Sequence, residues 1–183
     1  MNLAQNQTKI DLVTELGEED LDALCEATEE AIIDGNGFGW LQPPGRQTLA
    51  NYWRGVLLVP ERELYVARLA GRIVGSTQLL QPPANNEASA HAATLTTFFI
   101  APWARGHGLA KGLIRAVARS AVEQGFHQID LDVRETQTAA IALYEAEGFK
   151  RWGIKERYAY TNGRYVRGFY YTKDLKPHGK WRR

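Results

Sequence analysis

The sequence is built around the stretch Thr94-Leu95-Thr96-Thr97-Phe98-Phe99-Ile100, which passes Pro102 and continues as Arg105-Gly106-His107-Gly108-Leu109-Ala110. Its first part is rich in β-branched and aromatic side chains, so residues 95–100 are predicted to form a central strand. After the glycines, apolar side chains recur at helical spacing over 109–123, which predicts a helix. A helix start presents several backbone N–H groups and a positive dipole end. The stretch therefore predicts a site for a phosphate-bearing ligand.

The residue types at this helix start suit an anion. Gly106 and Gly108 lack Cβ atoms, so their backbone can approach a ligand closely and adopt unusual dihedral angles. Ala110 keeps the first turn narrow, and Arg105 and Lys111 can add positive charge. Two glycines before a helix can also form a plain loop. The preceding strand, Arg105 and the long apolar helix together favour the anion site.

Two other phosphate-binding patterns fit this helix start less well. A Walker loop needs Gly-Lys-Ser/Thr, which does not follow here. Gly106, Gly108 and Gly112, with Asp130 about twenty residues on, partly match a dinucleotide fingerprint. However, five residues separate Ile100 from Gly106, where the fingerprint needs a tight turn. Because the chain also lacks a series of βαβ units, dinucleotide binding is the last of the ligand hypotheses.

Composition indicates an ordinary globular protein. The chain has 183 residues, 44% of them hydrophobic and 23% charged, enough for a single domain with a real core. The net charge of +1 gives no broad field for nucleic acid, and we expect none to bind. The single cysteine, Cys25, excludes an internal disulfide and is expected to be a buried structural thiol. We see no signal peptide and no membrane-spanning run, so we expect a cytoplasmic protein without membrane contact.

The remaining elements are predicted from periodicity and turn residues. Residues 1–9 and 176–183 are expected to be flexible. Before the central stretch we expect a short strand, two helices, and two strands joined at Ala70-Gly71, over residues 10–13, 18–34, 48–58, 64–69 and 72–80. After it we expect a strand, a short helix closed by Gly148, and two last strands with a turn at Asn162-Gly163, over residues 129–133, 138–147, 150–154 and 168–174.

The central stretch resembles the acetyl-CoA-binding motif of the GCN5-related N-acetyltransferase (GNAT) family. The core of that motif is Arg/Gln-x-x-Gly-x-Gly/Ala, which Arg105, Gly108 and Ala110 meet. The run from Asp132 to Phe149 is similar to the second signature of the family, especially in ribosomal-protein alanine N-acetyltransferases. Residues 152–171 resemble resistance acetyltransferases of the tabtoxin-resistance type. The resemblance is specific over about residues 64–175.

This resemblance implies a fold and a cosubstrate. The fold would be α/β (α+β), with a mixed, mostly antiparallel sheet that splays between two central strands and carries helices on both faces. The cosubstrate would be acetyl-CoA, with no metal. Its pantetheine arm would bond to the backbone of the strand, its pyrophosphate would lie on N–H groups of the helix start, and Gln137, where the family often has Asn, could reach the pantetheine. The implied cofactor-binding residues are Phe98, Phe99, Ile100, Arg105, Gly106, His107, Gly108, Leu109, Ala110, Lys111 and Gln137.

Acetyl transfer to an amine needs a neutral amine, a polarised thioester carbonyl and a proton for the leaving thiolate. Tyr144 matches the tyrosine of the family and is the predicted general acid; the backbone N–H near Ile100 would polarise the carbonyl. The general base stays open. Asp132 matches a glutamate position of the ribosomal-protein enzymes. His91 carries an imidazole, the side-chain group that most often serves as a base near neutral pH. A water relay would need no single residue as the base. Thr94 and Thr96 stand where many members carry a glutamate.

Three functions follow as hypotheses. The first is an N-acetyltransferase that acetylates a small molecule or an amino-acid-like amine by direct attack. The second acetylates a protein N-terminus, and the third is a non-catalytic CoA-binding module. Trp40, Tyr158 and Tyr160 could line a site for the amine, because aromatic faces attract cations, or could pack in a homodimer. The sequence does not identify the acceptor.

Overall fold

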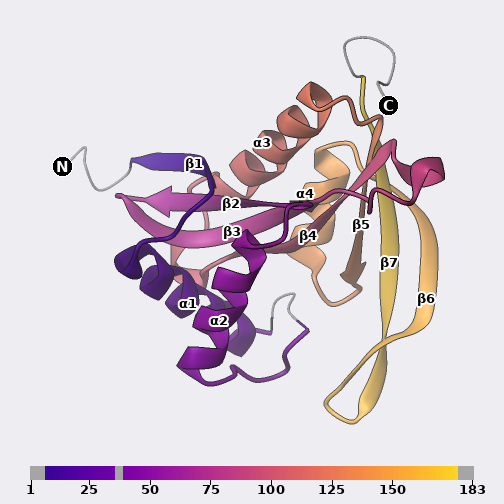
Figure 1. Ribbon diagram of the computed structural model, residues 1–183. Helices are drawn as coiled ribbons and strands as arrows, with labels where there is room; N and C mark the ends of the chain where they lie inside the picture. The colour runs from indigo at the N-terminus through magenta and orange to yellow at the C-terminus, as the bar shows by residue number, and fades with distance from the viewer. Residues whose placement is uncertain (1–6, 36–38, 177–183) are drawn as a thin grey trace. The chain divides into compact units, whose positions relative to one another are not determined.

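The computed structural model describes residues 7–35 and 39–176. Its helices and strands follow one another as shown in Figure 1: β1 (Thr8–Val13), α1 (Glu18–Ile33), α2 (Arg46–Leu57), β2 (Arg62–Leu69), β3 (Arg72–Leu80), β4 (Ala92–Ile100), α3 (Leu109–Glu123), β5 (Gln128–Arg134), α4 (Thr138–Ala146), β6 (Lys150–Thr161) and β7 (Arg164–Asp174). Short 3-10 turns cover Glu87–Ser89 and Pro102–Ala104. In this part of the chain, no helix is long and apolar enough to cross a membrane.

The strands form a seven-stranded mixed sheet in the order β1-β2-β3-β4-β5-β7-β6. β1 and β2, β5 and β7, and β6 and β7 pair antiparallel. β4 and β5 pair in parallel over residues 92–94 and 128–130, a ladder that covers three of the nine residues of β4. Three of these four pairings are antiparallel and one is parallel, so the predicted mixed, mostly antiparallel sheet is confirmed.

The chain divides into two compact units. The first unit comprises the residues up to Leu79 together with Thr97–Val117, and the second comprises Leu80–Thr96 together with the residues from Ala118 onward. Both β4 and α3 therefore contribute residues to each unit. We describe the two units separately.

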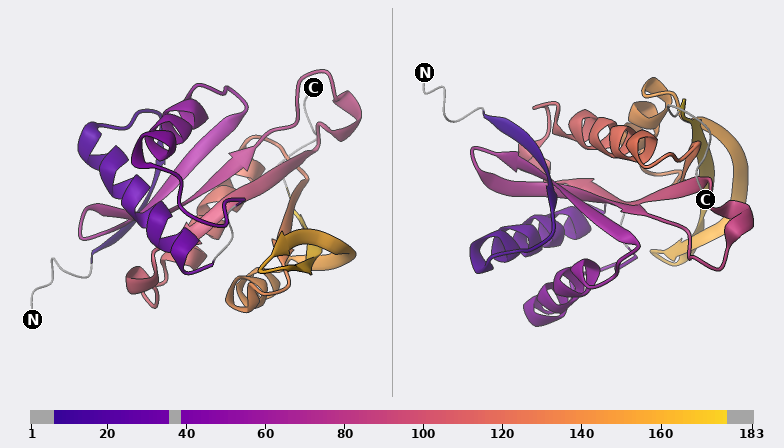
Figure 2. Two further views of the ribbon diagram at one scale, coloured as in Figure 1. Left: turned by 90° about the horizontal axis from the view of Figure 1, so that it is seen from below. Right: turned by 45° about the horizontal axis from the view of Figure 1, so that its top comes forward.

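The first unit packs helices on both faces of its strands. α1 and α2 cover one face of β1, β2 and β3, and the beginning of α3 covers the other (Figure 2). The core side chains Leu24, Leu49, Trp53, Val66 and Ile73 are fully buried. The Trp53 indole donates a hydrogen bond to the Thr28 hydroxyl at 3.1 Å, so this core buries no unpaired indole N–H.

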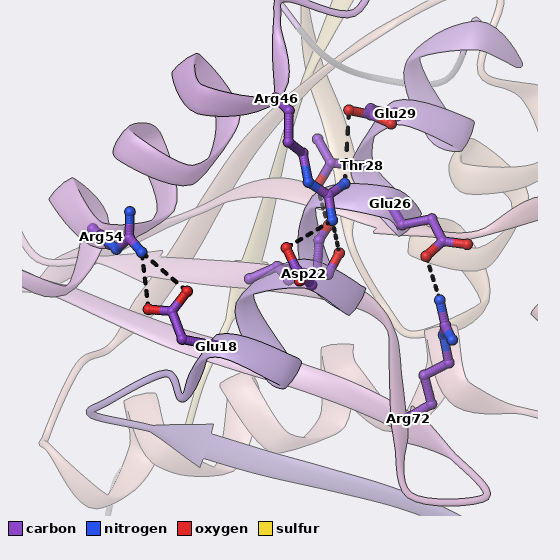
Figure 3. Close-up of polar contacts among 9 residues, drawn as sticks. Glu18, Asp22, Glu26, Thr28, Glu29, Arg46, Arg54 and Arg72 are labelled. Carbon is purple, nitrogen blue, oxygen red and sulfur yellow. Dashed lines mark hydrogen bonds and ion pairs between the residues drawn. The ribbon is translucent and has the colours of Figure 1, made fainter.

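Exposed ion pairs join α1 to its neighbours (Figure 3). Arginines of α2 and β3 meet acidic side chains of α1 in four pairs: Arg54 with Glu18 at 3.1 Å, Arg46 with Asp22 at 3.1 Å and with Glu29 at 3.7 Å, and Arg72 with Glu26. Pairs exposed to this degree contribute about 0–1 kcal/mol each. They orient the surface of α1, whereas its buried apolar face holds it in place.

The second unit is built on β5, β7 and β6. In β5, Ile129, Leu131 and Val133 are buried and alternate with polar residues that face the other side. β6 and β7 form a hairpin whose turn residues, Asn162 and Gly163, have φ angles of +51° and +75°. Two positive φ angles in succession are typical of the two-residue turns that match the twist of a hairpin.

Most predicted elements are confirmed, and their ends need correction. β1 includes Thr8 and Lys9, which we had expected in a flexible tail. α2 begins at Arg46, two residues early, and β4 begins at Ala92. β6 and β7 also run through residues 155–161 and 164–167, because the two strands stay paired up to the turn, although most side chains there, apart from the buried Val166, are exposed or half-buried. Residues 1–6 and 177–183, expected to be flexible, lie outside the described residues.

Cys25 has the structural role predicted for it. Its side chain is fully buried in α1, and burial raises the pKa of its thiol. A buried thiol of raised pKa carries little thiolate at neutral pH, so it is a poor nucleophile.

Candidate functional site

The end of β4 contains a residue in an unusual backbone conformation. Thr97 has a φ of +52°, a region that β-branched residues rarely adopt. The side chains that follow are increasingly enclosed: Phe98 is half-buried, while Phe99 and Ile100 are buried. A left-handed residue inside a strand reorients the peptide groups beside it and persists only where its surroundings hold it. The predicted pantetheine strand therefore has an irregular backbone at Thr97.

β3 approaches this end of β4 very closely. A Cβ atom at Gly75 would lie 2.4 Å from the Phe99 carbonyl oxygen and 2.6 Å from Cδ1 of Ile100. The Ala101 N–H donates to the Val74 carbonyl at 2.7 Å, which fixes the strand end. Only glycine fits at position 75. An isolated glycine inside a strand pattern often marks such a close approach, so the sequence held a signal here that our prediction did not use.

A polar chain supports the Thr97 side chain. Gln78 is fully buried; its Oε1 accepts from Arg62 at 2.6 Å and its Nε2 donates to the Tyr52 hydroxyl at 3.1 Å. The Tyr52 hydroxyl lies 3.5 Å from the Thr97 hydroxyl, and the edge of the Trp40 ring meets the Tyr52 ring at a centroid distance of 5.2 Å. Sequence analysis missed Tyr52 and Gln78, because nothing local in the sequence places them beside Thr97.

The two glycines before α3 adopt the conformations that their lack of a Cβ permits. Gly106 and Gly108 have φ angles of +84° and +75°. The Gly112 N–H donates to the Gly108 carbonyl at 3.0 Å, so the helical hydrogen bonding starts at Gly108. By helix geometry, the N–H groups of the next residues, including Leu109 and Ala110, are directed out of the helix start. Gly112 lies inside α3, where a Cβ atom would be only 3.1 Å from the Ile10 side chain. Close packing therefore accounts for this glycine, and no dinucleotide-binding role is needed to explain it.

The loop that carries these glycines is tied to the end of α1. Arg105 pairs with Asp34 at 2.7 Å, and the Trp103 indole donates to Glu30 at 2.7 Å. Nδ1 of the His107 ring lies 3.2 Å from the carbonyl oxygen of Ala104. The charge of Arg105 is therefore shared with a carboxylate, and the loop has fixed contacts within the first unit.

Tyr144 in the second unit is held by the way α4 ends. Gly148, with a φ of +89°, stops the helix; its N–H donates to the Glu145 carbonyl, and the Phe149 N–H donates to the Tyr144 carbonyl, both at 3.0 Å. This is a Schellman end, in which the residue after the glycine contacts the residue five positions back. The rings of Phe149 and Tyr144 accordingly meet at a centroid distance of 5.7 Å. The pattern Tyr-x-x-x-Gly-Phe thus fixes the tyrosine side chain.

The Tyr144 hydroxyl is kept as a neutral phenol. Its side chain is buried, and burial raises its pKa, with the nearby charge of Asp132 acting in the same direction. A phenol of raised pKa carries its proton throughout the neutral range.

The two aspartates of β5 differ in their partners. Asp130 accepts from the Gln128 amide at 2.8 Å and from the Thr172 hydroxyl, so it is engaged inside the sheet. Asp132 is exposed and accepts a hydrogen bond from the Tyr158 hydroxyl of β6. This pair was not predicted, because the register that joins residues 26 positions apart is not visible in the sequence.

The other predicted residues of the second unit occupy different surroundings. Gln137 is buried and directly precedes α4, where its N–H donates to the Arg134 carbonyl at 3.0 Å. His91 is exposed in the turn before β4, and its carbonyl accepts from the His127 N–H at 2.9 Å. The structure thus places Asp132 near Tyr144, and it puts His91 in a turn.

Comparison with known proteins agrees with this geometry. Residues 23–149 match the acetyltransferase (GNAT) family. The chain belongs to this family. Over 118 residues it is 58% identical to the "uncharacterized N-acetyltransferase in hisH-hisA intergenic region" of Azospirillum brasilense, an alignment that covers 64% of this chain and 70% of that protein. By this relationship the chain is an N-acetyltransferase.

Two solved structures share the GNAT fold of this chain. A ribosomal-protein-alanine N-acetyltransferase from Brucella melitensis has a TM-score of 0.76 at 21% identity, covering 91% of this chain and 99% of that one. A phosphinothricin acetyltransferase from Sinorhizobium meliloti, in complex with acetyl-CoA, has a TM-score of 0.75 at 20% identity and covers 93% of both chains. At such identities the likeness concerns the fold.

The glycine turn before α3 leaves its backbone accessible from outside. Cβ atoms placed on Gly106 and Gly108 would meet no atom within 4 Å, so the space in front of both residues is open. Phosphate oxygens could therefore approach the backbone of the turn and the N–H groups at the start of α3.

Proposed function

We propose that this N-acetyltransferase transfers the acetyl group of acetyl-CoA to the primary amine of a small or amino-acid-like acceptor by direct attack, with Tyr144 as the general acid. The observation that carries the proposal is the turn at Gly106 and Gly108, whose left-handed backbone and open front suit a pyrophosphate. The predicted cofactor residues on β4 and at the start of α3 would hold the rest of the cosubstrate.

Direct attack by the amine is favoured over an acetylated cysteine. The chain has one cysteine, and this residue is fully buried in α1 with a raised thiol pKa. The amine itself would therefore attack the thioester carbonyl, which the backbone N–H near Ile100 would polarise.

Tyr144 would supply the proton that the leaving thiolate takes up. The step needs a group that is protonated before the reaction, and the raised pKa of Tyr144 keeps the phenol in this state. Its position is fixed by the Gly148 helix end and the Phe149 ring. Gln137, which precedes the same helix, would contact the pantetheine.

Asp132 would accept the proton of the acceptor ammonium. It is exposed, so it can exchange protons with water, and its charge acts on Tyr144. His91 and a water relay are the competing routes. The variants Asp132→Asn and His91→Ala distinguish these routes. Only loss of the residue that serves as the base should change the acidic side of the profile of kcat/KM against pH, and a water relay predicts no change in either variant.

The test is turnover of acetyl-CoA over a panel of small amines and amino acids. Free CoA would be measured with a thiol reagent, and the acetylated product by mass spectrometry. We expect at least one acceptor to be acetylated, with the rate lost in Tyr144→Phe. CoA binding without turnover of any amine or peptide would instead support the non-catalytic alternative.

A protein N-terminus is the second candidate acceptor. The run around Asp132, which resembles ribosomal-protein alanine N-acetyltransferases, favours it. A panel of peptides with different N-terminal residues distinguishes the two acceptor classes. If the enzyme acetylates small amines but none of the peptides, a protein N-terminus is excluded as the acceptor.

A further inference from the structure

Tyr158 of β6 and Gly168 of β7 form an arrangement for which the proposed reaction has no assigned use. The Tyr158 hydroxyl donates a hydrogen bond to Oδ2 of Asp132, on β5. The strand order places β7 between β5 and β6, so the tyrosine side chain must lie across β7 to make this contact. It does so at Gly168.

Gly168 is the residue that lets the Tyr158 side chain cross the strand. A Cβ atom there would lie 2.1 Å from Cγ, 2.2 Å from Cδ2 and 2.7 Å from Cβ of Tyr158. These distances are far below van der Waals contact, so an alanine would displace the ring. Gly153 on β6 offers a contrast, because its Cβ would meet the Tyr170 side chain at an ordinary 3.5 Å.

The strand itself is irregular where Tyr158 lies. The register between β6 and β7 shifts between Lys155 and Ala159, so the hairpin does not keep simple alternation at this point. Such irregularities re-aim side chains. The Tyr158 ring then meets the Tyr170 ring edge to face at 6.4 Å, and Tyr170 is the β7 residue paired with Asp132.

We propose that Tyr158 is a positioning residue that fixes the orientation of the Asp132 carboxylate, and that Gly168 is required for it. This inference rests on the proposed function, in which Asp132 takes the proton of the acceptor ammonium. With Oδ2 held by the phenol, Oδ1 is presented in one direction. The ammonium N–H bond breaks, an O–H bond forms at Oδ1, and the neutral amine keeps its electron pair for attack on the thioester. The exposed carboxylic acid then returns its proton to water.

The phenol suits this role because it stays neutral. Burial raises the pKa of Tyr158, and the hydrogen bond to Asp132 and the charge of Asp132 raise it further. The groups that face this pair are Tyr170 of β7, Tyr144 of α4 and Arg134 of β5. A neutral donor holds the Asp132 carboxylate by a hydrogen bond without placing a second charge beside it.

The test compares kcat and KM of wild type, Tyr158→Phe, Gly168→Ala and the control Gly153→Ala, with the acceptor found by the amine panel. Without the phenol the Asp132 carboxylate is no longer held in one orientation, so we expect kcat to fall about tenfold in Tyr158→Phe while the KM for acetyl-CoA stays near wild type. Gly168→Ala keeps every polar group but displaces the Tyr158 ring, so it should show the same loss of kcat, whereas Gly153→Ala should match wild type.

The outcomes separate the two proposals. An unchanged kcat in Tyr158→Phe, or a KM for acetyl-CoA that changes as much as kcat, would overturn the positioning role and leave Tyr158 a packing residue. Absence of wild-type turnover would overturn the proposed function and this role with it. In that case urea unfolding of Asp132→Asn, Tyr158→Phe and the double variant would still report on the hydrogen bond, because non-additive losses of stability show that the two groups interact.

Discussion

The glycine turn before α3 and the tyrosine cluster around Asp132 hold their functional groups by different means. In the turn the groups belong to the backbone: Gly106 and Gly108 adopt positive φ angles, and the helix start directs its N–H groups outward. In the cluster the groups are the side chains of Tyr144, Tyr158 and Asp132, brought together by a helix end and by strand register. A backbone site is encoded locally, whereas a side-chain site depends on distant pairings. Substitutions in the two regions should therefore fail differently.

The largest expected effect is the loss of turnover in Tyr144→Phe. Removing a general acid costs about 10²–10⁴-fold in rate, so kcat should fall by at least about a hundredfold. The KM for acetyl-CoA should stay near wild type, because the glycine turn is untouched. Steady-state kinetics on the acceptor found by the panel measure both values. The exposed Tyr165 provides the control, since Tyr165→Phe should retain full activity.

Gly75→Ala should produce the next largest effect, on stability. Its Cβ would meet a backbone carbonyl oxygen at 2.4 Å, which cannot move without shifting β4. We expect the free energy of unfolding to fall by about 2 kcal/mol or more in urea titrations. Gly55→Ala in α2 is the matched control: a Cβ there meets open space, and alanine should raise stability by about 0.5–1 kcal/mol. Equal stability of Gly75→Ala and wild type would contradict the close approach of β3 and β4.

Gly108→Ala should have a smaller effect that separates binding from stability. Its φ of +75° makes alanine strained by about 1 kcal/mol. Gly71→Ala, at a φ of +85° in the β2–β3 turn, carries the same strain away from the cofactor turn. Both variants should lose similar thermal stability, but only Gly108→Ala should raise the KM for acetyl-CoA, by about tenfold. A similar rise of the KM for acetyl-CoA in both variants would show that the turn at Gly106 and Gly108 has no special role in binding.

The last prediction concerns the stability of the second unit at alkaline pH. Burial raises the pKa of Tyr171 to about 12, with help from its hydrogen bond to Glu145. Because the pKa of this phenol is higher in the folded state than the unfolded value of about 10, the folded protein binds the phenol proton more tightly than the unfolded chain does. The resulting stability is complete below pH 10 and is lost as the pH rises toward 12. Urea midpoints should decline less steeply over this range in Tyr171→Phe than in wild type or in Tyr160→Phe.

Local sequence was enough to predict the glycine turn before α3 and the helix that carries Tyr144. Gly106, Gly108 and Gly148 act through their own φ angles, so their neighbours in sequence reveal their roles. The left-handed Thr97 could not be predicted, because a threonine gives no sign of a positive φ. The pairing of Tyr158 with Asp132 depends on an irregular register between β6 and β7, which only the assembled sheet shows. The periodicity of apolar residues likewise failed to predict the turn ends of these two strands.

Calorimetric titration of CoA into Gly108→Ala and Tyr144→Phe tests the division between the two regions most directly. If the backbone turn binds the cofactor and the tyrosine moves the proton, Gly108→Ala should bind CoA about tenfold more weakly, a loss of about 1.4 kcal/mol. Tyr144→Phe should bind CoA with the affinity of wild type. Wild-type affinity in Gly108→Ala together with weakened binding in Tyr144→Phe would contradict this account.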